Sequence, residues 1–517
     1  MVNLLVWIGA PAAAWPPPGL PPAHTSDDKR GAAQSAEESH SLEPGKPIER
    51  ELSGGRSHFY KINLTSGQYL QIAVSQRGID VVVALYTPDG KKIDDADSEH
   101  ATAGSESISA IAEAAGAYMV EARSAEKTAQ TGRYEIKVEE LRAATAEDKY
   151  RVAGETIFRE AERLGNGTTD DKRKSIKKYH EALDLYRRAG ARVREALTLN
   201  NIGLIYQSLG ETQKALERFN ESLPISRAVG NRRGEASMLN NIGMVYQSLG
   251  ETQKALEKYN EALLLSRTVG YRIVEAVTLH NIGEVYHSLR ETQKALAKYN
   301  EALPIRRTLG DRSGEAATLH NIGAVYRSLG ETQKALEKYN EALPIFQFVG
   351  ARNGEAAALL GIAQVEQQRG NLTQALQTIQ QAVGMIESLR TNIAGQRLRA
   401  SYFASRQEFY QSYIDVLMRM QMQNPTAAFD SLALEVSERA RARSLLELLM
   451  ESRPDLRQGV DGSLLERKRS LQQLLNAKAA AQFALLNRKY SRASRSLRQR
   501  DSITHHRVRG VECADSR

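Results

Sequence analysis

One segment of the chain recurs four times with a period of 40 residues, beginning at Asn200, Asn240, His280 and His320. The first copy reads NNIGLIYQSLGETQKALERFNESLPI, and the later copies repeat it with few changes. Self-similarity at a period of about 20–50 residues is typical of solenoids, because one unit cannot bury its apolar face alone whereas stacked units can. The repeat therefore predicts a stack of similar units rather than a single globular core.

Apolar residues at three- and four-residue spacing predict two consecutive helices in each copy, the first ending near Gly210 within SLGET. A glycine inside a helix costs about 1 kcal/mol relative to alanine. Its recurrence in every first helix therefore indicates that the second helix packs closely against it. The predicted core of the repeats comprises Leu199, Ile202, Gly203, Tyr206, Ala215, Phe219, Gly243, Tyr246, Ala255, Gly283, Tyr286, Ala295, Gly323, Tyr326 and Ala335.

The spacing G-x2-Y followed by A-x3-F/Y-x2-A resembles the tetratricopeptide signature. A standard unit has about 34 residues, and the six additional residues here lie around AVGNRRGEA. This longer variety resembles the repeats of kinesin light chain and of LGN-type polarity scaffolds. We expect repeats over residues 145–385, with four strong units within 191–350 and degenerate capping units on both sides. Arg290 replaces the turn glycine of the third copy, which predicts local backbone strain.

An asparagine stands one residue before the core isoleucine of each first helix, at Asn201, Asn241, Asn281 and Asn321. In the repeats that this chain resembles, first helices line a concave surface and equivalent asparagines contact the ligand backbone. An amide can both donate to and accept from an extended peptide, so the resemblance implies the same role for these four residues. The alternative is that each asparagine hydrogen-bonds a neighbouring repeat and orders the stack.

Other predicted positions of the groove differ between the copies, as positions that determine specificity should. They are Asn200, Asn240, His280, His320, Gln207, Gln247, His287 and Arg327. LGN-type repeats also place an arginine early in the first helix. The corresponding residues here do not support a preference for an acidic ligand: Leu197, Ser237, Val277 and Ala317.

The chain before the repeats divides into a leader at residues 1–43 and a β-rich region at residues 44–142. The leader has a short apolar run and an Ala12–Ala14 stretch that resemble a signal peptide, so we favour export over a cytoplasmic location. Short alternating runs such as SHFYKINL and GQYLQIAV predict a β-sandwich. The run LEPGKPIERELSGGRSHFYKINLTSGQYLQIAV resembles the opening of the bacterial pre-peptidase C-terminal domain, which implies an accessory module without catalysis.

Two segments of the chain invite chemical interpretations that we do not favour. DDADSE, from Asp94 to Glu99, lacks the ligand spacing of a calcium loop, so we interpret it as a solvated turn. Residues 501–517 should be a disordered tail. His505 or His506 could pair with Cys513, the single cysteine, but a nucleophile needs a folded cradle that the tail cannot provide.

Residues 386–500 are predicted to be long amphipathic helices without the repeat. ALEVSERARARSLLELL together with DLRQGV resembles the connector of tetratricopeptide proteins that carry a C-terminal CHAT domain, a caspase-like peptidase module with a His/Cys dyad. The chain ends at Arg517, so we expect this catalytic module to be missing. The end from Ser463 onward carries thirteen Lys/Arg against four Asp/Glu. We interpret this basic helix as a solvated or docking surface rather than a nucleic-acid site.

These features predict a β-sandwich followed by an all-α tetratricopeptide solenoid and a helical connector. The predicted function is a scaffold that binds an extended peptide or a partner protein in the concave groove of the repeats. The alternative is the regulatory or substrate-recruiting part of a CHAT-type cysteine peptidase. We expect no catalytic residue, metal, cofactor or small-molecule substrate, and no membrane-spanning segment, because no apolar run is long enough.

Overall fold

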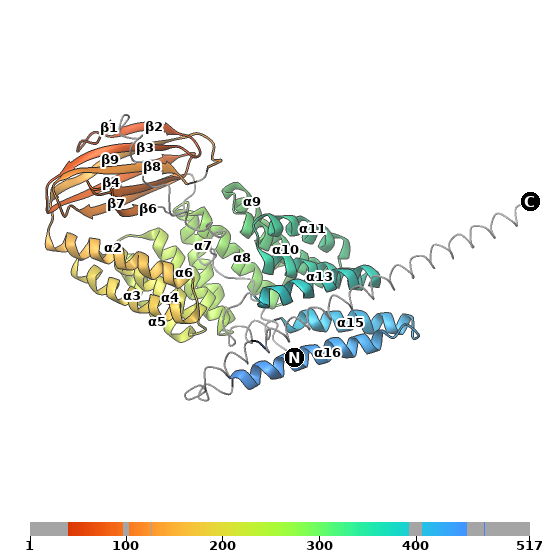
Figure 1. The fold of residues 1–517 in the computed structure, drawn as a ribbon. Helices are drawn as coiled ribbons and strands as arrows, with labels where there is room; N and C mark the ends of the chain where they lie inside the picture. Colours follow the sequence, from red (N-terminus) through yellow and green to blue (C-terminus); the bar gives the residue numbers. More distant parts are fainter. Residues whose placement is uncertain (1–39, 97–102, 126, 392–405, 452–469, 471–517) are drawn as a thin grey trace, which may run out of the picture. The chain divides into compact units, whose positions relative to one another are not determined.

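The computed structural model describes residues 40–96, 103–125, 127–391, 406–451 and 470 (Figure 1). The chain divides into two compact units, one of residues 1–394 with 406–437 and the other of residues 395–405 with 438–517. The β-strands and the repeated helices lie in the first unit. Residues 1–39 of the predicted leader, the end of DDADSE and the predicted tail lie outside the described residues.

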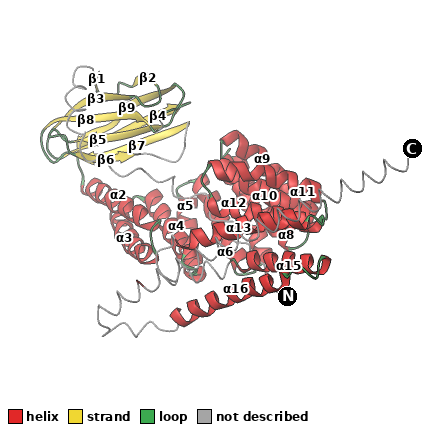
Figure 2. Ribbon diagram, turned by 45° about the vertical axis from the view of Figure 1, so that its right-hand side comes forward, coloured by secondary structure: helices red, strands yellow, loops and turns green. Residues whose placement is uncertain are grey.

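The β-rich region forms two stacked sheets (Figure 2), which confirms the predicted sandwich. One sheet has the order β1-β3-β8-β5-β6 and the other β2-β9-β4-β7, with antiparallel pairing except between β1 and β3. The strands are β1 His40–Ser41, β2 Ile48–Leu52, β3 Ser57–Leu64, β4 Gln68–Arg77, β5 Val81–Tyr86, β6 Lys92–Ala96, β7 Ala103–Ile111, β8 Gly116–Ser124 and β9 Gly132–Ala143.

The core of the sandwich follows from period-two alternation, with Tyr60, Ile62 and Leu64 of β3 all directed inward. The hydroxyl of Tyr60 lies 2.5 Å from that of Tyr134 on the opposite sheet, so two buried polar groups satisfy each other. Strand β7 was not predicted, because its sequence AGSESISAI consists of small and polar residues around two isoleucines.

The interpretation of DDADSE as a solvated turn was wrong for its first residues. Asp94 and Asp95 lie in strand β6, and the Asp94 carboxylate forms an ion pair with Arg159 of helix α2. The side chain of Asp94 is only 10% exposed, and burial raises its pKa. Arg159, rather than a bound metal ion, therefore pairs with this carboxylate.

Helical hairpins follow the sandwich and form the predicted tetratricopeptide solenoid (Figures 1 and 2). Each hairpin has a first and a second helix, and the helices of one hairpin contact each other more extensively than they contact the next hairpin. The pairs are α2 Ala146–Gly165 with α3 Thr169–Arg188, α4 Arg192–Ser208 with α5 Thr212–Ala228, α6 Arg232–Ser248 with α7 Thr252–Thr268, α8 Arg272–Ser288 with α9 Thr292–Leu309, α10 Arg312–Ser328 with α11 Thr332–Phe348, and α12 Arg352–Gln368 with α13 Leu372–Thr391. Two more helices are α15 Gln407–Gln423 and α16 Phe429–Glu451.

The stack curves toward its first helices. From α4 to α12, each first helix contacts the first helix of the next hairpin, whereas contacts between consecutive second helices are sparser. The first helices therefore line the inner side of the solenoid, which is the side that such folds use as an extended binding surface.

Close approach within each hairpin depends on the repeated glycine of the first helix. A Cβ atom at Gly243 would lie 2.6 Å from the ring of Tyr259, and one at Gly203 would lie 2.5 Å from the ring of Phe219. These distances are shorter than carbon atoms tolerate. The aromatic ring of the second helix therefore requires glycine at this position, and the close packing predicted from the recurrence is present. This packing offsets the cost of glycine in helix propensity.

A buried carboxylate holds each connection between hairpins. Glu235 is 5% exposed, and it accepts from Arg227 Nε at 2.7 Å and from Arg232 Nη1 at 2.9 Å. Arg227 ends one hairpin, and Arg232 with Glu235 begins the next. The same R-x4-R-x2-E arrangement recurs at Glu195, Glu275 and Glu315. It closes the segment that lengthens this repeat to 40 residues.

The strain predicted at Arg290 is present. Its φ of 61° lies in the left-handed region, where Gly210, Gly250 and Gly330 occupy the equivalent turns with φ near 75°. Such a backbone conformation costs a residue with a Cβ atom about 1 kcal/mol or more. The hairpin of α8 and α9 therefore keeps the turn of the others although it lacks their glycine.

We expect Glu235→Gln and Glu315→Gln each to lower the free energy of unfolding by about 1–3 kcal/mol at neutral pH, because two arginines lose their shared carboxylate. Burial acts to raise the pKa of each carboxyl, but hydrogen bonds and charge from the two arginines outweigh burial and hold it below 4.5. This stabilisation is therefore present above pH 4.5 and is lost as the pH falls through the lower folded-state pKa.

Urea denaturation from pH 7 down to about pH 3 checks this expectation. The difference between wild type and variant should close in the acidic part of the range. Glu217→Gln, at an exposed position of α5, is the control and should change little at any pH. A difference that persists unchanged at acidic pH would show that the carboxylate charge is not what stabilises the connection.

Candidate functional site

The inner side of the solenoid presents one stripe of residues from each first helix. Positions spaced by four, four, three and four residues share one helical face, and most of them are partly exposed while the neighbouring faces are buried. We call these positions the inner stripe. It comprises Val193, Leu197, Asn201, Leu204 and Ser208 of α4, Arg233, Ser237, Asn241, Met244 and Ser248 of α6, Ile273, Val277, Asn281, Glu284 and Ser288 of α8, and Ser313, Ala317, Asn321, Ala324 and Ser328 of α10.

The repeated asparagines form a hydrogen-bonded ladder between hairpins. Asn241 Nδ2 donates to Asn200 Oδ1 at 2.9 Å, across one repeat. Asn281 Nδ2 donates in the same way to Asn240 Oδ1 at 3.0 Å. The acceptor in the preceding hairpin is thus the residue directly before its own NIG asparagine. The structure therefore brings these two sets of predicted site residues together.

Histidine replaces asparagine at the later steps of the ladder. Asn321 Nδ2 lies 3.2 Å from His280 Nε2 and donates to Glu284 Oε1 at 3.3 Å. His280 Nδ1 lies 3.1 Å from the hydroxyl of Thr318. Replacing Asn240 by His280 at the equivalent position therefore changes the acceptor from an amide oxygen to a ring nitrogen, while the asparagine of NIG remains the donor.

Burial distinguishes the end of the ladder from its middle. Asn241, Asn281 and Asn321 are at most 8% exposed. Asn201 is half-buried, and among the described residues it bonds only to Asn200 and to the Tyr179 hydroxyl, at 3.3–3.4 Å. The amides in the middle are engaged in ordering the stack, as the alternative interpretation expects. Contact with the backbone of a ligand remains a prediction for all four.

A second column of predicted site residues runs beside the inner stripe: Gln207, Gln247, His287 and Arg327. All four are partly exposed. The Tyr259 hydroxyl donates to Gln247 Oε1 at 2.7 Å. In the preceding hairpin, Phe219 stands at the position of Tyr259 and has no hydroxyl, and Gln207 Oε1 is buried without a hydrogen-bond partner. The outer edge of an aromatic ring of the core, such as that of Tyr259, therefore contacts a residue of this column.

Two histidines of the predicted site have a pKa lowered by their surroundings. Burial, reinforced by the nearby charge of Arg327, lowers the pKa of His287 below 6.5. The same causes lower the pKa of His320 to about 4, and its ring packs on Tyr339 at 5.2 Å between centroids. Both histidines are therefore neutral at physiological pH.

The predicted core residues of the repeats lie in two environments. The aliphatic, glycine and alanine members and Phe219 are buried. The tyrosines of the first helices are half-buried, and each ring has a lysine at 5.3–5.5 Å from its centroid, a cation–π arrangement: Tyr206, Tyr246, Tyr286 and Tyr326. The tyrosines thus cover the edge of the core instead of filling it.

The carboxylates of the hairpin connections were missed at the sequence level, although the signal was available. The pattern R-x4-R-x2-E recurs with the period of the repeat, at Arg187, Arg192 and Glu195 and again in each later copy. A charged triplet conserved in spacing between copies, unlike the variable exposed residues, indicates an ion-pair network.

Helix α15 continues the inner side beyond the recognisable repeats. Gln364 of α12 stands at the inner-stripe position of Glu284, and its Nε2 donates to Glu408 Oε1 at 3.0 Å and to Ser412 Oγ at 2.9 Å. Gln380 Nε2 of α13 donates to the Tyr413 hydroxyl at 3.0 Å. The first part of the predicted connector therefore packs on the last hairpin as another first helix would.

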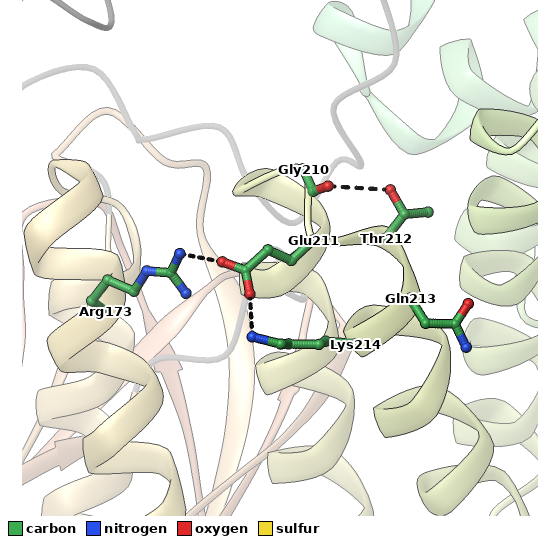
Figure 3. Close-up of a pocket in the computed structure, with 6 residues that line it drawn as sticks. All are labelled: Arg173, Gly210, Glu211, Thr212, Gln213 and Lys214. Atoms are coloured by element: carbon green, nitrogen blue, oxygen red, sulfur yellow. Dashed lines mark hydrogen bonds and ion pairs between the residues drawn. The ribbon is translucent and has the colours of Figure 1, made fainter.

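A surface depression lies at the turn between α4 and α5 (Figure 3). Arg173 and Lys214 both point at the carboxylate of Glu211, and the Lys214 ion pair measures 2.8 Å. None of the predicted groove residues lines this depression. Its charges compensate one another, so it offers little to a charged ligand.

Within the described residues, no group of three or more His, Cys, Asp or Glu side chains could hold a metal ion. Across the same part of the chain, no helix is both long and apolar enough to cross a membrane. His505, His506 and Cys513 fall outside the described residues.

We expect Asn281→Ala to lower the free energy of unfolding by about 1 kcal/mol, because it removes a buried hydrogen bond between hairpins. Asn201→Ala should cost less, since Asn201 is half-buried and its bonds are longer. Thermal and urea denaturation of both variants measure the difference. If Asn281→Ala unfolds like the wild type, the amide does not order the stack and is free for a ligand.

Several solved structures are similar to this chain in fold. BtubC (BKLC) from P. vanneervenii is 22% identical, with 40% of this chain and 93% of that chain covered and a TM-score of 0.30. A Rap protein complexed with competence and sporulation factor is 14% identical, with 57% and 76% covered and a TM-score of 0.39. NprR in complex with its cognate peptide NprX is 17% identical, with 63% and 88% covered and a TM-score of 0.34.

Comparison with protein families assigns both halves of the described fold. Residues 56–124 match the bacterial pre-peptidase C-terminal domain. Residues 161–228, 234–308 and 310–388 match the tetratricopeptide repeat. A search of curated proteins gave no significant match. The chain therefore contains a bacterial pre-peptidase C-terminal domain followed by an array of tetratricopeptide repeats.

Proposed function

We propose that this protein is an interaction scaffold whose inner stripe binds an extended segment of a peptide or partner protein. One observation supports this most directly: partly exposed apolar side chains gather on the inner side. Val193 is 50% exposed, Leu197 37% and Ile273 39%, and Leu204, Met244 and Val277 lie on the same stripe. Covering such side chains with a partner removes apolar surface from water and stabilises a complex.

The stripe also combines constant and variable positions in the way that peptide recognition requires. The asparagine is the same in α4, α6, α8 and α10. The residue three positions later changes from leucine to methionine, glutamate and alanine. Regular polar groups suit the regular backbone of an extended peptide, while variable side chains select among its residues.

The proposal predicts that removing inner apolar side chains weakens binding without affecting stability. The probe is a phage-displayed library of random dodecapeptides selected on the full chain, followed by fluorescence anisotropy with an enriched peptide. The triple variant Val193→Ser, Leu197→Ser, Ile273→Ser should raise Kd about tenfold or more, because it removes three exposed apolar side chains that a bound peptide would cover.

A matched control removes exposed aliphatic residues from second helices and their ends. Val229→Ser, Leu264→Ser and Leu309→Ser change side chains that are 37%, 71% and 42% exposed, and Kd should stay within about twofold. Equal losses in the two triple variants would contradict an inner binding site. If the full chain enriches no peptide, the proposed function is wrong for peptide ligands.

A second candidate function rests on the connector sequence. ALEVSERARARSLLELL, which resembles the connector of CHAT-type peptidases, falls in α16. On this proposal the repeats recruit or regulate substrate for a caspase-like peptidase module. A peptidase assay of the purified chain with a fluorogenic peptide mixture tests it, and we expect no turnover by this chain alone. Turnover that survives Cys513→Ala would require a different catalytic residue and would contradict the assignment as a scaffold.

A further inference from the structure

Arg327, the one arginine in the second column of the inner side, has no carboxylate partner among the described residues. The arginines of the R-x4-R-x2-E triplets each pair with a buried glutamate, and Arg194, Arg218 and Arg306 also have acidic partners. Among the described residues, Arg327 forms no ion pair, and its Nε is buried without a hydrogen-bond partner. The side chain is partly exposed at the inner side of α10, so a bound molecule can reach it.

The neighbours of Arg327 leave its charge unbalanced. The Tyr339 hydroxyl interacts with it, but a hydroxyl does not neutralise a guanidinium. His287 and His320 are neutral at physiological pH. Two carboxylates lie in this part of the site, and both accept hydrogen bonds from other side chains: Glu284 from Asn321, and Glu408 from Gln364.

We propose that Arg327 binds the carboxylate of an aspartate or glutamate side chain in the bound peptide. This proposal rests on the proposed function and specifies its ligand. A guanidinium presents a rigid fork of donors that fits a carboxylate, and a partly buried pair of this kind is stronger than a surface pair. The three other members of the column, Gln207, Gln247 and His287, are neutral, so they do not supply a competing positive charge.

The position of Arg327 also orders the ligand along the solenoid. The exposed apolar residues Val193 and Leu197 belong to α4, three hairpins before the helix of Arg327. The peptide should therefore place apolar side chains over α4 and α6 and an acidic residue over α10. In LGN-type repeats the corresponding arginines stand early in the first helix, where this chain has Leu197, Ser237, Val277 and Ala317. The acidic preference proposed here depends instead on Arg327, near the end of a first helix.

The test uses the full chain and the same random dodecapeptide library. Selection on the wild type should enrich Asp or Glu at one position relative to the apolar residues, and selection on Arg327→Gln should lose that enrichment while keeping the apolar residues. Arg218→Gln is the matched control. It removes a positive charge from the second helix α5, outside the inner stripe, where Arg218 pairs with Glu221 at 2.7 Å, and it should keep the acidic preference.

One enriched peptide and its amide analogue, with Asp→Asn or Glu→Gln, then measure the pair directly. On the wild type the amide analogue should bind about 10- to 100-fold more weakly, as expected for loss of a charge-assisted hydrogen-bonded pair. On Arg327→Gln the two peptides should bind alike. This comparison of peptides on the wild type remains informative even if the Arg327→Gln chain folds poorly.

The outcomes separate this proposal from the proposed function. Peptides that bind the inner stripe but carry no acidic preference, or an amide analogue that binds within about threefold of its parent, would overturn the role of Arg327 and leave the scaffold function standing. An acidic preference that persists in Arg327→Gln would overturn it as well. If the wild type enriches no peptide, both proposals fail together.

Discussion

The structure of the repeats depends on contact between a glycine of the first helix and an aromatic ring of the second. At Gly243 no Cβ atom fits, because the ring of Tyr259 lies where it would be. The ring is thereby held at a constant depth in each hairpin. The buried hydroxyl of Tyr259 in turn donates to the partly exposed Gln247 of the second column. A packing constraint in the core thus positions the groups that a ligand would meet.

Two polar networks convert these hairpins into a stack with one curvature. On the inner side, amides such as Asn281 bond from one first helix to the next. At the hairpin connections, buried carboxylates such as Glu235 join the end of one hairpin to the start of the next. Because these polar groups are largely buried and satisfied, they specify the geometry between hairpins. The inner stripe can then vary in sequence without changing the shape of the stack.

The sequence alone predicted those parts that depend on regular spacing. The 40-residue period, the close packing of two helices at the repeated glycine, and strands such as β3 all follow from regular residue spacing. Strand β7 escaped because it has small and polar side chains, and Asp94 was misinterpreted because its partner Arg159 is distant in sequence. For the asparagines, sequence left two roles open. The hydrogen bond of Asn281 to Asn240 depends on how neighbouring hairpins meet, which spacing within one hairpin does not determine.

A crystal structure of the full chain with a peptide selected from the random library tests the central claim most directly. The claim is that the first helices form the recognition surface, while the second helices and the connections build the stack. The account predicts an extended peptide along the inner stripe from α4 to α10, with apolar side chains against Leu197 and a carboxylate paired with Arg327. A peptide bound to the second helices or to the β-sandwich would contradict it.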